Sequence, residues 1–372
     1  MKAERRVPFF DYPRVYLDDR EDLLKIFEEV GHRGAFILQK DLDEFEKSLA
    51  NFVQAKYSIG VANATDGLEL SLMSIGLEKG DEVIICSHTM LATASAIITA
   101  GGTPVPVELG DDNLIDPQAI DDAISSRTVG IMPTQLNGRT CKMDKIIRTA
   151  EKNDLFVVED AAQALGSKFK GKYAGTFGLA SAISFFPAKV LGCLGDGGAV
   201  ITNNDDAYDK IYQLHDHGRD TEGNVKSWGR NSRLDNLQAA ILSHRLEIYE
   251  NHIQRRREVA SLYQEKLENV KELKLPPAPN SNPDHFDVYQ NYEIEAENRD
   301  NLKEYLDSKN IGTLIQWGGK GVHQWENLDF NIKLPKVERF FERCIMLPMN
   351  VFISNEDIEY ISESIKSFYT KY

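Results

Sequence analysis

Lys189 lies in a segment whose residue types suit covalent chemistry on a carbonyl group. It ends the run Ser184-Phe-Phe-Pro-Ala-Lys189 and precedes the glycine-rich run Gly195-Asp-Gly-Gly198. A lysine acts as a nucleophile when its surroundings hold it near an electrophile and let it lose its proton. The same segment also fits an ordinary surface lysine in a glycine-rich turn. It lacks the G-x-G-x-x-G and G-K-S/T spacings, so it supports neither a dinucleotide fold nor a P-loop.

A second segment has the residues of a phosphate cradle. Val61-Ala-Asn-Ala-Thr-Asp-Gly67 follows a predicted strand, contains small residues and opens a predicted helix at Thr65 and Asp66. Free N–H groups at a helix start can hold a phosphate. Thr65 or Asp66 acting as a plain helix cap explains the same residues, and the segment taken alone favours that simpler interpretation.

A third segment places an acid at the end of a predicted strand. In Leu155-Phe-Val-Val-Glu-Asp-Ala-Ala-Gln163, an apolar run leads into Glu159 and Asp160. Such an acid can bind a metal ion, act as a base, pair with a cation of a ligand, or cap the helix that follows. No histidine lies nearby in the sequence to complete a metal site, so we expect no metal.

Short apolar runs alternate with segments of helical periodicity through the first two thirds of the chain. The runs predict strands at 57–61, 82–86, 103–107, 129–133, 155–158, 182–186 and 199–202. Helical spacing occurs within 20–55 and at 67–75, 89–100, 117–125, 143–152 and 231–267. This α/β alternation predicts a large, mostly parallel sheet with helices on both faces. Ligands of such sheets bind beyond the carboxyl ends of the strands, where the three segments lie.

The last third of the chain has a different pattern. A proline-rich loop at 275–283 precedes a predicted strand at 289–294, a helix at 299–309, a strand at 313–316 and a final helix at 355–369. We therefore expect a large domain at 1–250, with an amino-terminal helical segment, and a smaller α+β domain at 251–372.

Together the three segments supply what pyridoxal phosphate requires. Lys189, which follows Asp160 by 29 positions, would form an imine with the aldehyde of the cofactor. The carboxylate would keep the pyridine nitrogen protonated, so that the ring accepts electrons from a carbanion, and the helix start would hold the phosphate.

The order and wording of these motifs resemble the DegT/DnrJ/EryC1/StrS family of sugar aminotransferases, which depend on pyridoxal phosphate. The resemblance implies the aspartate-aminotransferase-like fold, fold type I. The matching segments span nearly the whole chain: Phe36-Ile-Leu with Phe45-Glu, Ala62-Asn-Ala-Thr-Asp66, Val158-Glu-Asp-Ala-Ala-Gln163, Ser184-Phe-Phe-Pro-Ala-Lys189, Gly195-Asp-Gly-Gly198, His217-Gly-Arg219, Asn231-Ser-Arg-Leu-Asp-Asn-Leu-Gln-Ala-Ala240 and Met346-Leu-Pro-Met349.

The resemblance also implies roles for individual residues. Lys189 is expected to bond to the cofactor and then move the proton between the substrate carbon and the cofactor. Asp160 is expected at the pyridine nitrogen and Gln163 at the ring hydroxyl. The phosphate is expected to be held by Ala64, Thr65 and Ser184, joined by Asn231 from the other subunit of a homodimer with shared active sites. His217, Arg219 and His323 fall on segments that the family places near the sugar substrate, although a packed histidine explains His323 equally well.

Three positions depart from the family pattern. Met90 stands where the family usually has an aromatic residue that stacks on the pyridine ring, although a thioether can still pack on a ring face. A loop that commonly reads His-Leu-Tyr-Gly is Gln135-Leu-Asn-Gly138, and Val190 stands where Asn commonly follows the lysine. These changes lie near the cofactor and substrate, so we expect them, Gln135 included, to affect which sugar is accepted.

The resemblance predicts a transaminase that moves an amino group from L-glutamate to a nucleotide-linked 3-keto-6-deoxy sugar, for amino-sugar biosynthesis. Relatives that dehydrate sugars have a histidine in place of the lysine. The segment Gly34-Ala-Phe-Ile-Leu38 resembles members acting at sugar C3, although Gln39 stands where those members have Gly. The alternatives are amination at C4 of a 4-keto nucleotide sugar, a cyclitol substrate, and a non-catalytic regulator that keeps the cofactor fold.

The bulk composition excludes several classes of protein. The net charge of -15 argues against a nucleic-acid partner, and the 372 residues leave no room for an added DNA-binding domain. The amino terminus has no apolar core of signal-peptide length, and no run approaches the length of a membrane span. The four scattered cysteines fit free thiols in a reducing compartment, so we expect a cytoplasmic protein.

Overall fold

Strand β2 (Glu82–Cys86) lies inside the main sheet and is buried on both faces. Because side chains alternate along a strand, Val83 and Ile85 pack against the helices of one face, while Ile84 and Cys86 pack against those of the other. The first face is covered by α4 (Ala64–Ile75) and α5 (Leu91–Thr99), and the second by α6 (Pro117–Ala123) and α7 (Met143–Asn153). The computed structural model describes residues 5–371. Residues 1–4, the start of the amino terminus, and residue 372 lie outside the described residues.

The main sheet has seven strands, and only one runs against the others. In spatial order they are β1 (Tyr57–Val61), β9 (Gly198–Thr202), β8 (Ala180–Ser184), β5 (Phe156–Asp160), β4 (Thr128–Met132), β2 and β3 (Thr103–Val107). Strand β9 is antiparallel to both of its neighbours. All seven predicted strands are confirmed to within two residues. The other six strands therefore end at one edge of the sheet, at which β9 begins.

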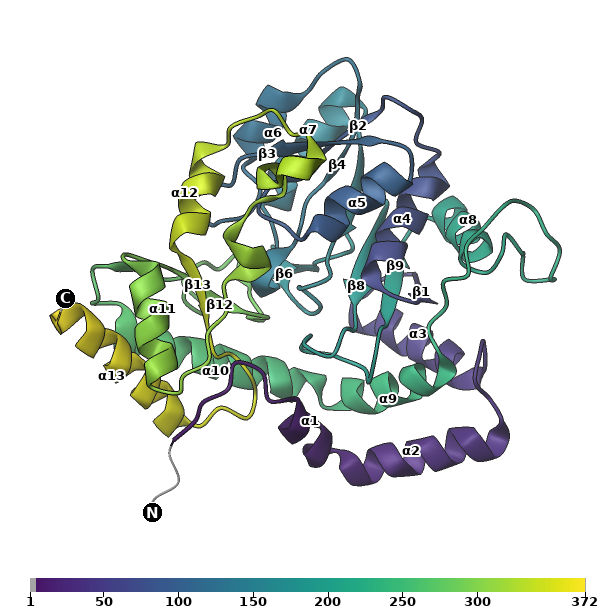
Figure 1. Ribbon diagram of the computed structural model, residues 1–372. Coiled ribbons are helices and arrows are strands. Elements are labelled where there is room, and N and C mark those ends of the chain that lie inside the picture. Colours follow the sequence, from purple (N-terminus) through teal and green to yellow (C-terminus); the bar gives the residue numbers. More distant parts are fainter. Residues whose placement is uncertain (1–4, 372) are drawn as a thin grey trace.

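The remaining helices of this part surround the sheet at its β1 side and along the base of the molecule (Figure 1). They are α1 (Tyr12–Asp18), α2 (Arg20–Arg33), α3 (Lys40–Phe52), α8 (Asp205–His215), α9 (Asn236–Glu247) and α10 (Tyr249–Leu267). A small sheet of β6 (Lys168–Phe169), β7 (Lys172–Tyr173) and β11 (His285–Phe286) lies beside them. Within residues 5–371 no helix combines the length and apolar character needed to cross a membrane.

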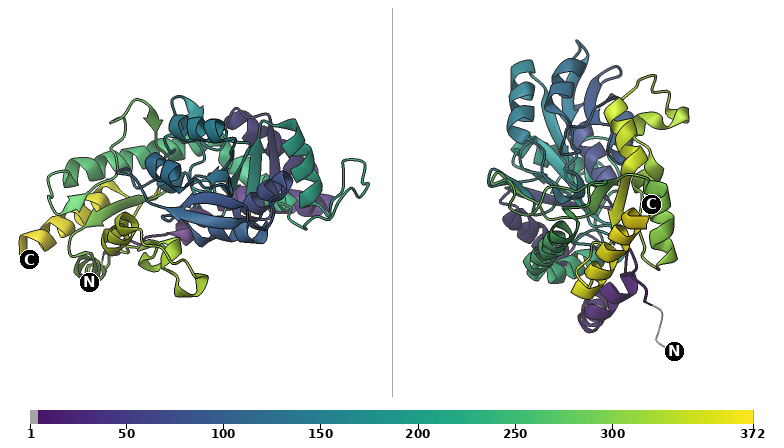
Figure 2. Two further views of the ribbon diagram at one scale, coloured as in Figure 1. Left: turned by 90° about the horizontal axis from the view of Figure 1, so that it is seen from above. Right: turned by 90° about the vertical axis from the view of Figure 1, so that its left-hand side faces the viewer.

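A second sheet and core form the carboxyl-terminal part. Its strands are β10 (Leu273–Lys274), β12 (Tyr292–Ala296) and β13 (Cys344–Leu347), and its helices are α11 (Arg299–Ser308), α12 (Pro335–Arg343) and α13 (Asn355–Lys371). Helix α13 packs on α10 and α11, as Figure 2 shows from two sides. The strand predicted from residue 289 begins only at Tyr292, because Tyr289 has a left-handed backbone (φ 51°).

The strand predicted at 313–316 is wrong. Leu314 makes only an isolated bridge to Met346, and the chain then enters the 3₁₀ turn η2 (Gln316–Gly319). Trp317, Gly318 and Gly319 all have positive φ angles, which a strand cannot accommodate. The two glycines adopt this conformation freely, whereas the tryptophan is strained by it. Two further 3₁₀ turns, η3 (Val322–Gln324) and η4 (Glu326–Leu328), follow.

Helix α10 belongs to both parts of the molecule. Its first turns place Tyr249 and Ile253 in the core beneath β8 and β9, and its later turns place Val259 and Tyr263 in the carboxyl-terminal core. Val7, near the amino terminus, also packs in the carboxyl-terminal core. We propose that this second unit includes the segment around Val7. The boundary at residue 250 stays a prediction.

Candidate active site

One cavity of about 680 Å³ opens at the edge where the strands of the main sheet end. This size is typical of pockets for small molecules. Seven of the eight predicted cofactor residues line it: Ala64, Thr65, Met90, Asp160, Gln163, Ser184 and Lys189. They follow four different strands, so the topology of the sheet brings together residues that are far apart in the sequence.

The start of α4 forms one end of the cavity. The side chain of Asn63 accepts a hydrogen bond of 2.9 Å from the N–H of Asp66, so Asn63 is the helix cap rather than Thr65 or Asp66. The first-turn N–H groups of Ala64 and Thr65 have no carbonyl partner within the helix, and such groups hold anions. A side chain at Gly198 would clash with the backbone of Asn63 and Ala64, so this glycine allows β9 to begin against the helix start.

Asp160 supplies a buried carboxylate at the end of β5. Thr93 Oγ1 donates to its Oδ2 over 2.6 Å, and the N–H of Ala162 donates to its Oδ1 over 3.2 Å. Thr93 in turn shares a hydrogen bond of 2.7 Å with Thr89. Burial raises the pKa of Asp160 despite these donors and the positive charge of Lys189. A cation bound in the cavity would stabilise the ionised carboxylate.

Lys189 faces the same cavity from the loop after β8. Burial lowers the pKa of its ammonium group to about 8, although the negative charge of Asp160 opposes the shift. A lysine with such a pKa is a neutral amine in an appreciable fraction of molecules near neutral pH. It is therefore available as a nucleophile and as a carrier of protons.

The amide of Gln163 has a defined orientation. Its Oε1 accepts hydrogen bonds from the N–H of Asn137 (3.0 Å) and from Nδ2 of Asn291 (3.3 Å). The Oδ1 of Asn137 accepts from Asn291 and from Gln316, while its Nδ2 donates to the carboxylate of Glu293 over 2.6 Å. Since both donors meet Oε1, the Nε2 group of Gln163 is left to donate to an oxygen in the cavity.

Sequence patterns did not reveal the residues that orient Gln163. Asn291 lies 128 positions from Gln163, in an irregular segment before β12, and Gln316 lies in the turn that was predicted as a strand. Thr93 could have been noticed, because it follows Thr89 by one helical turn within the predicted helix at 89–100.

Comparison with known proteins identifies the group to which this site belongs. The model of the DegT/DnrJ/EryC1/StrS aminotransferase family matches residues 17–366. The chain belongs to this family. It is therefore an aminotransferase, and the enzymes of this family depend on pyridoxal phosphate.

The relatives span both chains almost completely. The dTDP-3-amino-3,4,6-trideoxy-alpha-D-glucose transaminase of Streptomyces venezuelae is 35% identical over 98% of this chain and 96% of its own. A pleiotropic regulatory protein of Geobacillus stearothermophilus is 34% identical over 98% of each chain. The crystal structure of S. venezuelae DesV in complex with a ketimine intermediate superposes with a TM-score of 0.93, at 32% identity over 98% of each chain. These similarities show fold type I for this aminotransferase.

The cavity of this family member suits the family's cofactor. The anion-binding helix start, the buried carboxylate and the lysine with a lowered pKa all line it. Met90 lines it as well and is 54% exposed, so its thioether can pack on a flat ring without displacing other side chains.

Two residues predicted to contact the sugar are buried in the aminotransferase and satisfied by protein partners. Gln135 is fully buried; its Oε1 accepts from the N–H of Cys141 over 2.6 Å, and its Nε2 donates to Glu159 over 2.7 Å. His323 pairs through Nδ1 with Ser87 over 2.7 Å and through Nε2 with Glu338 over 3.3 Å. Neither lines the cavity of its own chain, and a substrate role for Gln135 and His323 stays a prediction.

Three further predicted site residues, His217 and Arg219 for the sugar and Asn231 for the phosphate, lie on a hairpin, residues 216–231. This hairpin stands away from the body of the aminotransferase (Figure 1; Figure 2, left). His217, Arg219 and Asn231 are exposed and do not line the cavity of their own chain. The hairpin is held internally by a hydrogen bond of 2.7 Å from the N–H of His217 to the carbonyl of Arg230 and by a bridge between Asp216 and Asn231.

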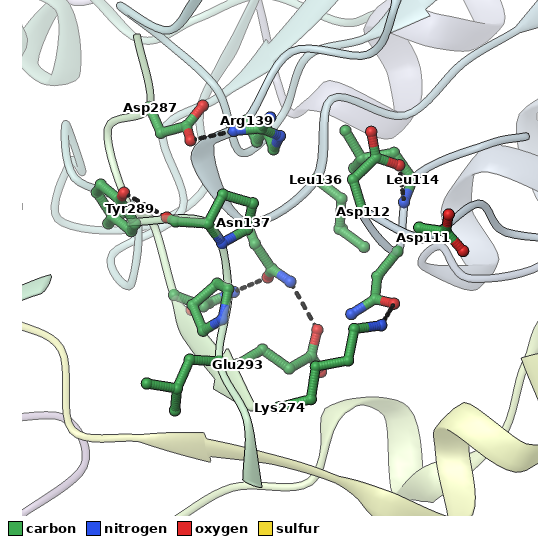
Figure 3. A pocket seen from close by; sticks show the side chains of 15 residues that line it. Asp111, Asp112, Leu114, Leu136, Asn137, Arg139, Lys274, Asp287, Tyr289 and Glu293 are labelled. Carbon is green, nitrogen blue, oxygen red and sulfur yellow. Dashed lines mark hydrogen bonds and ion pairs between the residues drawn. The ribbon is translucent and has the colours of Figure 1, made fainter. Parts of the chain in front are cut away.

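A second, smaller cavity of about 50 Å³ adjoins the first, because Leu136 and Asn291 line both. Figure 3 shows Asn137 above Glu293, with Arg139 paired to Asp287 on the opposite side. At this volume the cavity holds no ligand as large as a cofactor ring.

Proposed function

We propose that this aminotransferase binds pyridoxal phosphate in the 680 Å³ cavity and moves an amino group from L-glutamate to a nucleotide-linked 3-keto-6-deoxy sugar. The observation that carries the proposal is the meeting of Lys189, Asp160 and the start of α4 in one cavity at the strand ends. When bound, the cofactor supplies an aldehyde that carries the amino group and a ring that accepts electrons.

Each of these groups has a task that its surroundings support. Lys189 Nζ would hold the cofactor and, as a neutral amine, would move a proton, which its pKa of about 8 favours. Asp160 would hold a proton on the pyridine nitrogen, since a cation there would stabilise the buried carboxylate. The ionised state of that carboxylate is also supported by the hydrogen bond from Thr93.

The remaining cavity residues hold and orient the cofactor. The N–H groups of Ala64 and Thr65, with the hydroxyl of Ser184, take the phosphate. Gln163 donates its free Nε2 group to the ring oxygen, because its Oε1 is already occupied. Met90 packs on the ring face in place of the aromatic residue common in the family.

We further propose a homodimer in which the hairpin of one subunit completes the cavity of the other. His217 and Arg219 would contact the sugar there, and Asn231 would contact the phosphate. Two observations support the proposal: the hairpin is internally bonded, and its Trp228 is 94% exposed to solvent in the single chain. A large aromatic side chain at the surface is typical of an interface.

Amination at C3 is supported by the segment 34–38 and by the relative whose name places the amino group at C3. A half-reaction screen tests this choice. Enzyme loaded with the amino group from glutamate is offered 3-keto and 4-keto nucleotide sugars, and return of the visible absorbance of the lysine-bound cofactor is scored. We expect return with 3-keto sugars; return with 4-keto sugars alone would shift the assignment to C4.

Lys189→Ala tests the proposal as a whole. The variant should lose both the visible absorbance and turnover. Retention of both would contradict the proposed role of Lys189. Sequence-specific DNA binding without any turnover of glutamate by the wild-type protein would favour a regulator instead.

A further inference from the structure

The side chain of Gln290 forms hydrogen bonds to both residues that flank Lys189. Its Nε2 donates to the carbonyl of Ala188 over 2.9 Å, and its Oε1 accepts from the N–H of Val190 over 3.0 Å. The amide of Gln290 therefore bridges the backbone on the two sides of Lys189.

The loop that carries Lys189 has little regular structure of its own. Between β8 and β9 it forms only turns and bends, and within it the N–H of Lys189 bonds to the carbonyl of Phe186 over 2.8 Å. The N–H of Cys193 donates to the carbonyl of Phe185 over 2.8 Å, and side chains from elsewhere hold further parts of the loop: Arg245 donates to the carbonyl of Gly192, and Gln238 pairs with both backbone groups of Leu194. The backbone next to Lys189 is thus held by the bond to Phe186 and by the two hydrogen bonds of Gln290.

Gln290 is itself held firmly. It is 6% exposed, and Nη1 of the buried Arg256 donates to the carbonyls of Tyr289 (2.9 Å) and Gln290 (3.1 Å). On the preceding side, the N–H of Val288 donates to the carbonyl of Gly138 over 2.8 Å. Tyr289 is kept at a φ of 51°, a conformation that costs energy for a bulky residue and persists only where its surroundings impose it.

We propose that Gln290 is a positioning residue for the transamination reaction: it fixes the backbone on both sides of Lys189 and so sets where the amine lies in the cavity. Through Arg256, on α10, it ties the lysine loop to the carboxyl-terminal part of the chain. The inference rests on the proposed role of Lys189. Gln290 also lines the cavity, so its effect is exerted at the cofactor site itself.

The test compares Gln290→Leu with Gln238→Leu. The two glutamines make the same pair of hydrogen bonds, one to the residues beside Lys189 and the other to Leu194, so the second variant is a matched control. The first readout uses protein free of cofactor. Reductive methylation of Lys189 with formaldehyde and cyanoborohydride is followed against pH by peptide mass spectrometry, a measurement that needs no turnover.

In the wild type, methylation should reach half its maximum near the lysine pKa of about 8. In Gln290→Leu the freed loop lets water reach the amine, so the midpoint should move upward toward the ordinary 10.5, while Gln238→Leu keeps the wild-type profile. The second readout is steady-state kinetics. We expect kcat to fall by about 10²-fold in Gln290→Leu with little change in KM, because a displaced reacting group loses alignment rather than substrate affinity.

Equal profiles and equal kcat values in the two variants would overturn the inference. If Gln290→Leu does not fold, Gln290→Asn replaces it: the amide remains but is one methylene too short to span both partners, and wild-type behaviour of that variant would overturn the inference as well. A failure of the proposed function is seen separately, as turnover that survives in Lys189→Ala.

Discussion

Thr93 Oγ1 donates a hydrogen bond of 2.6 Å to Oδ2 of Asp160, the carboxylate at the end of β5. The donor lies on α5 and the acceptor at the end of β5, so the position of this helix affects the pKa of the Asp160 carboxylate. A hydrogen bond to the ionised form stabilises that form, and its removal raises the pKa of the acid.

Replacement of Thr93 by Val should weaken cofactor binding at low pH. With the donor gone, the pKa of Asp160, already raised by burial, rises further, and the carboxylate is protonated at a higher pH. As the pH is lowered, the dissociation constant of pyridoxal phosphate should therefore begin to rise at a higher pH in the variant than in the wild type. Thr99→Val, which removes an exposed hydroxyl bonded to the carbonyl of Ser95 on the same helix, should leave the profile in place.

Substitutions of the adjacent acids Glu159 and Asp160 should have different effects: the first should lower stability, and the second should lower the rate of catalysis. Glu159 is fully buried and accepts from Gln135 and from three backbone N–H groups, so Glu159→Gln should cost about 1–3 kcal/mol of unfolding free energy. Asp160→Asn should instead lower kcat by at least about 10²-fold, because it removes the charge that acts on the cofactor ring. Urea unfolding and single-turnover kinetics on both variants check this; equal effects on the two quantities would contradict it.

Lys189 should reduce the stability of the cofactor-free protein at neutral pH. Its pKa is about 8 when folded and about 10.5 when unfolded, so between these values the unfolded chain binds more protons and stability rises with pH. Lys189→Met should therefore be more stable than the wild type at pH 7, by about 1–3 kcal/mol. The difference should shrink through the pH range from 8 to 10.5 in denaturant titrations. A difference that does not vary with pH would argue against burial as the cause of the lowered pKa.

Subunit mixing should restore activity if the hairpin acts across the dimer. Lys189→Ala lacks the nucleophile, and a variant with Ala at His217, Arg219 and Asn231 lacks the hairpin contacts, so each alone should be nearly inactive. With random pairing, about half of the dimers are heterodimers, and each heterodimer has one intact site of two. The mixture should therefore have about a quarter of wild-type activity. No recovery after co-refolding would show that the hairpin serves its own subunit or none.

Met90→Phe should bind the cofactor more tightly. An aromatic ring stacked on the pyridine adds about 0.5–1.5 kcal/mol beyond its apolar area, or roughly twofold to tenfold in affinity. Met90 is half-exposed, so the larger side chain meets little crowding. Equilibrium dialysis of pyridoxal phosphate measures the change, and Met73→Phe, on α4 away from the cavity, should show none.

The chemistry-bearing residues could be predicted from the sequence because each stands at the end of a locally recognisable element. Asp160 ends an apolar run, and Lys189 follows another, so parallel strands alone bring them to one edge. The residues that orient them could not be predicted. Gln290, Asn291 and Gln316 act from irregular segments, where neither periodicity nor turn chemistry specifies the partner.

The strand prediction at 313–316 failed because the conformation of the following residues outweighed local preference. Thr313–Gln316 has strand-like residues, yet the positive φ angles from Trp317 onward divert the chain. The sequence also could not predict that the amide of Gln135 bonds Glu159 and Cys141, because no spacing rule distinguishes its buried position from the cavity wall.

Helix α10 limits how this enzyme can be recombined with its relatives. Ile253 and Val259 lie less than two turns apart, yet they belong to different hydrophobic cores. A chimera joined at residue 250 would take all of α10 from one parent. The core residues beneath β8 and β9 that pack on its first turns would come from the other parent. Exchange of the carboxyl-terminal part between family members should therefore succeed only when α10 and the residues of both cores that pack on it come from the same parent.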